Sequence, residues 1–75
     1  MKSMFIQLAS GQSVKKFVSV ISQFNGSFEL VSDRTVLDAK SILGIYSLDL
    51  SKPILLRIEH DDNDNLDLLL EFRAQ

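Results

Sequence analysis

The sequence predicts an α+β fold in which helices cover one face of a four-stranded antiparallel sheet. Several short runs of β-branched and other apolar residues alternate in the way that half-buried strands do. One longer segment instead has apolar residues at every third or fourth position, which is typical of an amphipathic helix. The segments follow in the order β-α-β-β-α-β-α with no linker or repeat, so we expect a single two-layer domain over residues 1–75.

Length and composition restrict the class of protein. A chain of 75 residues makes one domain, and at this size only about 60% of the unfolded chain's surface is buried on folding. The composition, 45% hydrophobic and 24% charged, is that of a globular protein able to fold alone. Because the chain has no cysteine, it can form neither a disulfide framework nor a thiolate metal site, which fits an intracellular protein.

Charge and hydropathy exclude two kinds of partner. The net charge of -2 argues against nucleic acid, because a polyanion normally requires a clustered basic face, and Lys15 and Lys16 are the only adjacent bases. No apolar run approaches the ~20 residues that span a bilayer, and the first residues lack the apolar core of a signal peptide. We therefore expect a cytoplasmic protein that binds neither nucleic acid nor membrane.

The first strand is expected over residues 5–8, with Met4, Ile6 and Leu8 on one face. A helix is expected to follow over residues 13–25. Its apolar face is formed by residues three or four positions apart, namely Val14, Phe17, Val18, Ile21 and Phe24.

Capping residues set the expected ends of this helix. Ser13 has the character of an N-cap, since its hydroxyl can accept a backbone N–H one turn further on. Asn25 and Gly26 are typical of the left-handed conformation that ends a helix.

The second half of the chain predicts a hairpin, a short helix, a strand and a final helix. Residues 28–31 and 35–37 are rich in strand-forming side chains and are separated by a turn-forming cluster. Ser41 is expected to cap a short helix over residues 41–46. Pro53 begins the next element, a strand over residues 54–58 in which every second side chain faces inward.

The last helix is expected over residues 62–73, where an acidic run would cap it. Carboxylates near a helix N-terminus interact favourably with the helix dipole. A calcium loop is a poorer explanation for residues 61–65, because the glycine and the glutamate that an EF-hand requires are missing. His60, which precedes this run, is expected to be an exposed loop residue that is neither phosphorylated nor bound to metal.

Residues 38–48 carry the most specific residue order in the chain. The order Lys-Ser-Ile-Leu-Gly followed by Ser-Leu resembles the regulatory-serine segment of the histidine-containing phosphocarrier (HPr) family of the sugar phosphotransferase system. The resemblance in element order extends from about Val14 to the C-terminus. It implies the HPr-like open-faced β-sandwich, with Ser41 as the serine that opens the short helix. It also implies a docking surface for partner proteins, formed by Phe17, Ile42, Leu43 and Tyr46.

The residue that gives the family its activity is missing. The resemblance places a histidine just ahead of the first long helix, with an arginine nearby, but residues 9–16 contain neither, and this loop is shorter than the family's. A phosphohistidine relay needs an imidazole nitrogen as nucleophile. We therefore expect no standard phosphocarrier activity, no catalytic residue and no cofactor or metal.

Three interpretations of function remain open. The first is a monomeric regulatory or protein-binding module that uses the Ser41 helix, with sugar-system components, a serine kinase or a transcription regulator as the partners that the resemblance implies. The second is a phosphocarrier that uses Ser10, Ser13 or His60 instead. The third is a small interaction module unrelated to sugar transport.

Two serine sites have competing explanations. Ser41 fits both a plain helix cap and a switch, since a phosphate there would repel an apolar or acidic partner. At the start of the long helix, free backbone N–H groups with Ser10, Ser13 and Lys15 could hold a small anion.

Overall fold

The computed structural model describes residues 2–59 and 66–74. Its elements follow in the predicted order, with a 3₁₀ helix last. They are β1 (Lys2–Ile6), α1 (Gly11–Ile21), β2 (Phe28–Ser32), β3 (Thr35–Asp38), α2 (Ile42–Tyr46), β4 (Ile54–Ile58) and η1 (Leu66–Phe72).

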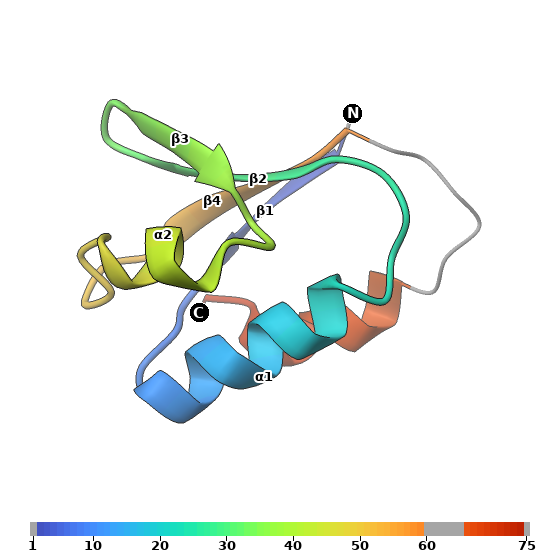
Figure 1. Ribbon diagram of the computed structural model, residues 1–75, viewed down its shortest axis with the longest axis horizontal. Helices are drawn as coiled ribbons and strands as arrows, with labels where there is room; N and C mark the ends of the chain where they lie inside the picture. The colour runs from blue at the N-terminus through green and yellow to red at the C-terminus, as the bar shows by residue number, and fades with distance from the viewer. Residues whose placement is uncertain (1, 60–65, 75) are drawn as a thin grey trace.

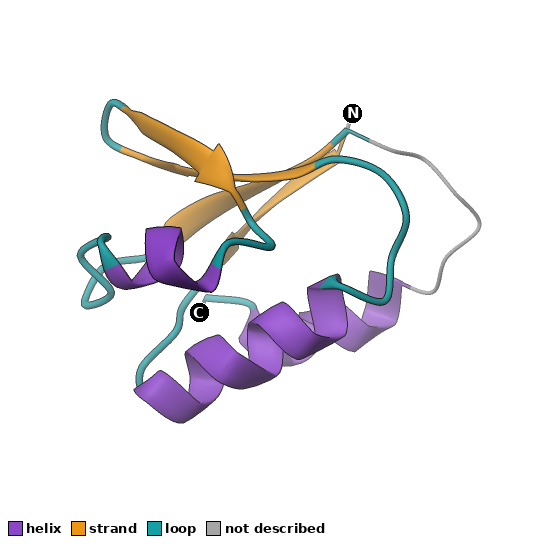
Figure 2. Cartoon of the chain, in the orientation of Figure 1, coloured by secondary structure: helices purple, strands orange, loops and turns teal. Residues whose placement is uncertain are grey.

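The four strands form one antiparallel sheet in the order β1-β4-β2-β3. The helices lie on one side of this sheet, with α1 and η1 next to each other beneath it (Figure 1). The opposite face is not covered by any helix or strand of the described residues (Figure 2). The predicted α+β fold with an open antiparallel sheet is therefore confirmed.

β4 is the strand that the sequence predicted best. Its bounds are the expected ones, and Ile54, Leu56 and Ile58 all face the buried side. Alternation along the strand places every second residue against the helices, as predicted. The core that these residues share with the helices is Ile6, Leu8, Val14, Phe17, Ile21, Phe24, Phe28, Leu30, Ala39, Ile45, Ile54, Leu56, Ile58, Leu69 and Phe72.

For β1, the sequence predicted correctly which side chains face the core, but it predicted the wrong bounds. Ile6 and Leu8 are buried and Phe5 is exposed, yet the strand covers Lys2–Ile6 and not residues 5–8. Pairing with β4 ends where Ile6 lies opposite Ile54. The residue just before β4 is Pro53, which has no backbone N–H to donate to a ladder. The strand therefore lies further toward the N-terminus.

The last described residues pair with the C-terminal end of β1 at its outer edge. Ile6 forms an isolated bridge with Arg73. The Gln7 N–H donates to the Phe72 carbonyl at 2.8 Å, and the Ala74 N–H donates to the Phe5 carbonyl at 2.9 Å. β3 forms the other edge of the sheet.

α1 begins earlier than predicted. Ser10, and not Ser13, is the N-cap, and its Oγ accepts the Ser13 N–H at 3.2 Å. The expected apolar face is correct, since Val14 and Phe17 are buried. The regular helix ends at Ile21, before the expected end at residue 25, and Gly26 adopts the left-handed conformation with φ 104°.

η1 packs against α1 through aromatic rings. The rings of Phe17 and Phe72 meet edge to face with centroids 5.3 Å apart. Lys16 Nζ lies 2.9 Å from Glu71 Oε2 between the same two elements. Residues that are three apart face the same way in a 3₁₀ helix, and Leu69 and Phe72 are both buried in this manner. The prediction of a helix here was correct for 66–72, whereas residues 60–65, including His60, lie outside the described residues.

The hairpin and the short helix match their predictions. β2 and β3 pair from Ser32 opposite Thr35, and Asp33 in the turn has a positive φ of 54°. Asp tolerates this left-handed conformation better than most residues. α2 follows at once, capped by Ser41 as expected.

Candidate functional site

The surface of α2 is built around the Ser41 cap. Ser41 has an extended backbone, and its Oγ accepts the Gly44 N–H at 3.2 Å. This hydrogen bond satisfies one of the backbone donors that every helix start leaves free. Ser41 itself is exposed, so its hydroxyl lies at the edge of a solvent-accessible surface.

Apolar side chains next to this hydroxyl are unusually exposed. Leu43 is 81% exposed and Tyr46 is 45% exposed, while Ile42 is half-buried against the core. Ile45 alone among the helix residues is fully buried and holds α2 to the rest of the fold. We call the exposed group, Ser41, Ile42, Leu43 and Tyr46, the α2 surface.

The α2 surface is continuous with the start of α1. The Tyr46 hydroxyl donates to the Gly11 carbonyl at 3.4 Å. A Cβ on Gly11 would lie 3.6 Å from that hydroxyl, so the two elements approach closely here. The structure thus brings together two of the regions that the sequence singled out, the serine helix and the start of the long helix.

The predicted anion site at the start of α1 has a simpler arrangement. Ser10 Oγ accepts the Ser13 N–H and lies 3.2 Å from Ser13 Oγ. The two hydroxyls therefore contact each other and the helix backbone. Lys15 is exposed on the next turn. These contacts describe a capped helix.

Phe17 does not belong to an accessible surface. The resemblance placed it in the docking surface, but its side chain is fully buried under η1 against Phe72. The three- and four-residue spacing correctly put Phe17 on the apolar face of α1. That face is covered by the C-terminal helix, so Phe17 stabilises the fold and is removed from the contact patch.

The charged groups next to Ser41 in the sequence already have partners. Lys40 is next to it in sequence, but its Nζ donates to the Phe24 carbonyl at 2.8 Å and lies 5.7 Å from the centre of the Phe28 ring. Asp38 Oδ1 accepts the Lys40 N–H at 2.9 Å, which holds a carboxylate three residues before Ser41. A phosphate on Ser41 would add negative charge beside a carboxylate while the neighbouring ammonium is engaged elsewhere.

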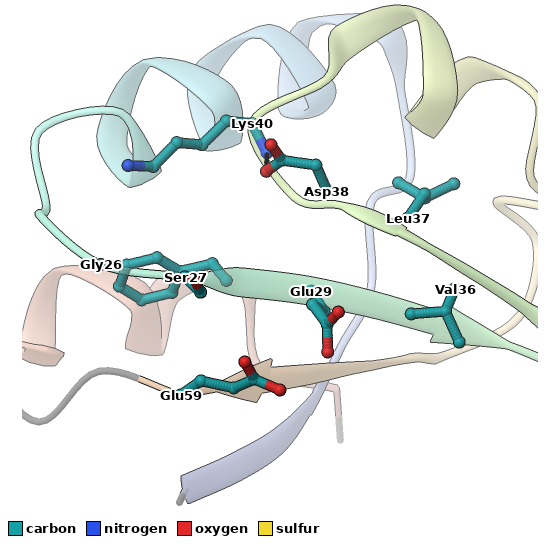
Figure 3. A pocket seen from close by; sticks show the side chains of 9 residues that line it. Gly26, Ser27, Glu29, Val36, Leu37, Asp38, Lys40 and Glu59 are labelled. Carbon is teal, nitrogen blue, oxygen red and sulfur yellow. Dashed lines mark hydrogen bonds between the residues drawn. The ribbon is translucent and has the colours of Figure 1, made fainter.

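A second feature, missed by the sequence reasoning, is a hollow of about 410 Å³ beside the end of β3 (Figure 3). Glu29 and Glu59 lie close together in it, and the Lys40 side chain extends away from them. The residues that line it are Gly26, Ser27, Phe28, Glu29, Val36, Leu37, Asp38, Lys40 and Glu59.

Arg57 lies between the two glutamates of this hollow. Its guanidinium donates to Glu29 and lies 4.0 Å from Glu59. The hydrogen bond from Arg57 lowers the pKa of the Glu29 carboxyl, and the same bond raises the pKa of Arg57. The outward direction of these two side chains could have been predicted from the sequence. Glu29 and Arg57 each alternate with core-facing neighbours in their strands, so both must point away from the helices.

The described residues offer no metal-binding cluster. Within residues 2–59 and 66–74, no group of three or more histidine, cysteine, aspartate or glutamate side chains could hold a metal ion. The same part of the chain has no helix of the length and apolar character needed to cross a membrane.

Comparison with known proteins identifies no relative. No protein-family model, curated protein or solved structure matches the chain.

Proposed function

We propose that this chain is an HPr-like regulatory protein that binds a partner protein through the α2 surface and carries no phosphate on histidine. The observation that carries the proposal is the exposure of Leu43 and Tyr46 beside the capping hydroxyl of Ser41. Large apolar side chains grouped on the surface of a small domain usually mark a contact site. The order of elements agrees with what the resemblance implies.

Binding would be driven by burial of the α2 surface. Fully burying a leucine contributes about 1.5–3 kcal/mol, so a partner that covers Leu43 gains a large share of its affinity from one side chain. Sugar-system proteins, a serine kinase and a transcription regulator are the partner classes that the resemblance implies.

Phosphorylation of Ser41 would oppose this binding. A phosphoserine adds a charge of about -1.5 to -2 at neutral pH, and desolvating that charge in an apolar contact is costly. The helix itself would remain formed, because an anion at the N-cap interacts favourably with the backbone N–H groups.

The first test is intact-mass spectrometry after two parallel incubations. One contains phosphoenolpyruvate and enzyme I, the general phosphotransferase of the sugar system, and the other contains ATP and the family's serine kinase. We expect one phosphate from ATP alone, mapped to Ser41 and absent from Ser41→Ala. A phosphate gained from phosphoenolpyruvate would contradict the loss of carrier activity, and no phosphate from either donor would contradict the switch.

The second test separates charge from capping. Both Asp and Asn can cap a helix, but only Asp adds charge. We expect Ser41→Asp to weaken binding to a responsive sugar-system protein by about tenfold, whereas Ser41→Asn binds like the parent. The measurement is a calorimetric titration.

Loss of the apolar contact has its own matched pair. Leu43→Ser should abolish the same interaction, and Leu68→Ser should not, because Leu68 is an exposed leucine on η1 outside the α2 surface. If the two Ser41 variants, Leu43→Ser and Leu68→Ser all bound the partner equally well, the α2 surface would be ruled out as the contact.

A further inference from the structure

We propose that the bare face of the sheet binds a basic amphipathic helix of a partner protein, independently of the α2 surface. The face carries a straight line of apolar side chains that crosses all four strands. Phe5, Leu55, Val31 and Val36 form this line, which we call the apolar row.

The strand register defines the apolar row. Phe5 lies opposite Leu55, Leu55 opposite Val31, and Val31 opposite Val36. Successive residues of a strand point to opposite faces, so these four face away from the helices. The neighbouring line across the strands points into the core instead and consists of Met4, Leu56, Leu30 and Leu37.

The apolar row is open to solvent. Phe5 is 57% exposed and Val36 is 51% exposed, while Leu55 and Val31 between them are half-buried. None of the described helices covers this side of the sheet (Figure 1). A continuous apolar line of this kind is an expected contact site for another molecule.

Carboxylates flank one side of the apolar row and favour a basic partner. The next outward-facing line contains Arg57, Glu29 and Asp38 in consecutive register, and Glu59 follows two residues after Arg57. Arg57 is engaged by Glu29, and the Lys40 ammonium is engaged by the Phe24 carbonyl. Glu29 and Glu59 share the Arg57 guanidinium, and the Lys40 ammonium extends away from both carboxylates (Figure 3), so a partner's lysine or arginine adds complementary charge.

Dimensions and hollows favour a short helix as the occupant. Three strand spacings make the apolar row about 14 Å long, which is the length of about nine helical residues. At the Phe5 end, a hollow of about 390 Å³ opens at the β1 edge of the sheet, and its apolar lining suits an apolar side chain. The residues that line it are Ser3, Met4, Phe5, Leu70, Arg73 and Ala74. At the Val36 end, the hollow with the carboxylates suits a cationic one.

A second copy of this chain fits the face less well. Each copy carries a net charge of -2 and the same acidic flank, so stacking two bare faces adds like charges to the contact. A partner helix with leucines on one side and lysines beside them meets both the apolar row and the flank.

The test uses a synthetic 14-residue leucine-lysine amphipathic peptide as the probe. Chemical-shift mapping of the full chain should show changes at the amides of β1, β4, β2 and β3 around the apolar row. A matched peptide with glutamate in place of lysine should bind at least tenfold more weakly. Val36→Lys should weaken binding of the lysine peptide by about tenfold, with its fold checked by circular dichroism.

A charge variant and a surface control complete the experiment. Glu59→Gln should weaken the lysine peptide about threefold at low salt and reduce its salt dependence. Leu43 lies on the α2 surface and not in the apolar row, so Leu43→Ser should leave the peptide affinity unchanged. The peptide experiment can therefore fail without affecting the proposed function. The proposal would be overturned if the two peptides bound equally well, or if the protein associated with itself through the bare face. It would also be overturned if the lysine peptide caused no chemical-shift changes, or changes confined to α2 or to β3.

Discussion

Ser10 and Ser41 perform the same local task at the start of helices of very different length. In both cases the serine Oγ accepts the N–H of the residue three positions later at 3.2 Å. α1 has eleven residues and a buried apolar face, so packing also holds it. α2 has five residues and one buried side chain, so its formation depends more heavily on the cap.

Replacing the α1 cap should show which serine begins the helix. We expect Ser10→Ala to lower the free energy of unfolding by about 1 kcal/mol, because a backbone N–H loses its acceptor. Ser13→Ala should cost less, since Ser13 contributes its hydroxyl only to the contact with Ser10. Urea denaturation of both variants measures the difference, and a larger loss for Ser13→Ala would place the cap where the sequence predicted it.

Two carboxylates make stability depend on acid pH. Arg57 lowers the pKa of Glu29 below its usual 4.5, and hydrogen bonds from Ser51 lower the pKa of Asp49 below its usual 3.8. A carboxyl with a lower pKa in the folded state stabilises the fold above its unfolded-state pKa, and this stabilisation is lost as the pH falls through the folded-state value.

We therefore expect the urea midpoint to decrease below about pH 4.5. Asp49→Asn should reduce the size of that decrease, because one of the two carboxyls no longer titrates. An unchanged midpoint down to about pH 3 would contradict the assignment.

At the scale of elements, η1 is the part that completes the core. Its Leu69 is fully buried and its Phe72 packs on Phe17, whereas the adjacent Leu70 is 52% exposed. The 3₁₀ helix thus presents one face to α1 and leaves the other to solvent.

Substitution of these two neighbouring leucines should give very different results. Leu69→Ala should destabilise the protein by about 3 kcal/mol, because it removes buried methyl groups and leaves a cavity. Leu70→Ala should change the stability by less than about 0.5 kcal/mol. Thermal denaturation followed by circular dichroism compares them, and similar melting temperatures would show that η1 is not part of the core.

Sequence patterns predicted the helices and strands better than they predicted the tertiary contacts between them. The bounds and facing of β4 followed from Pro53 and from strict alternation. The start of α1 did not, because Ser10 and Ser13 lie three residues apart and both have cap chemistry. Phe17 was placed on the correct helix face, but periodicity could not show that η1 covers that face, since contact between distant segments is a tertiary property.

The candidate site was predicted in the same uneven way. Ser41 and its neighbours on α2 follow from local order, and their exposure agrees with the expectation. The apolar row and the carboxylates beside it depend on register between four strands, which alternation within one strand cannot supply.

At the scale of the whole molecule, β4 and β2 are the two central strands and should be the most protected ones. Hydrogen exchange reports local opening, which is least frequent where both edges of a strand are paired. We expect the amides of β4 and β2 to exchange slowest and those of β3 and α2 to exchange fastest. Faster exchange in β4 than in β3 would contradict this order of local stability.

The two proposed contact surfaces use different sides of the fold. α2 lies on the helical side of the sheet (Figure 2), whereas the strand register places the apolar row on the opposite, bare face. The protein would then be able to hold two partners at the same time.

The pairing of β1 with β4 has a consequence for how quickly the chain folds. Lys2 lies opposite Ile58 and Ile6 opposite Ile54, so the contacts of β1 with β4 close loops of roughly fifty residues. The β2-β3 hairpin closes over a two-residue turn and can form first. Such long-range pairing slows folding relative to helical proteins of the same size. Substitutions in β1 should therefore act mainly on the rate of unfolding, while those in the hairpin act on the rate at which the sheet first forms.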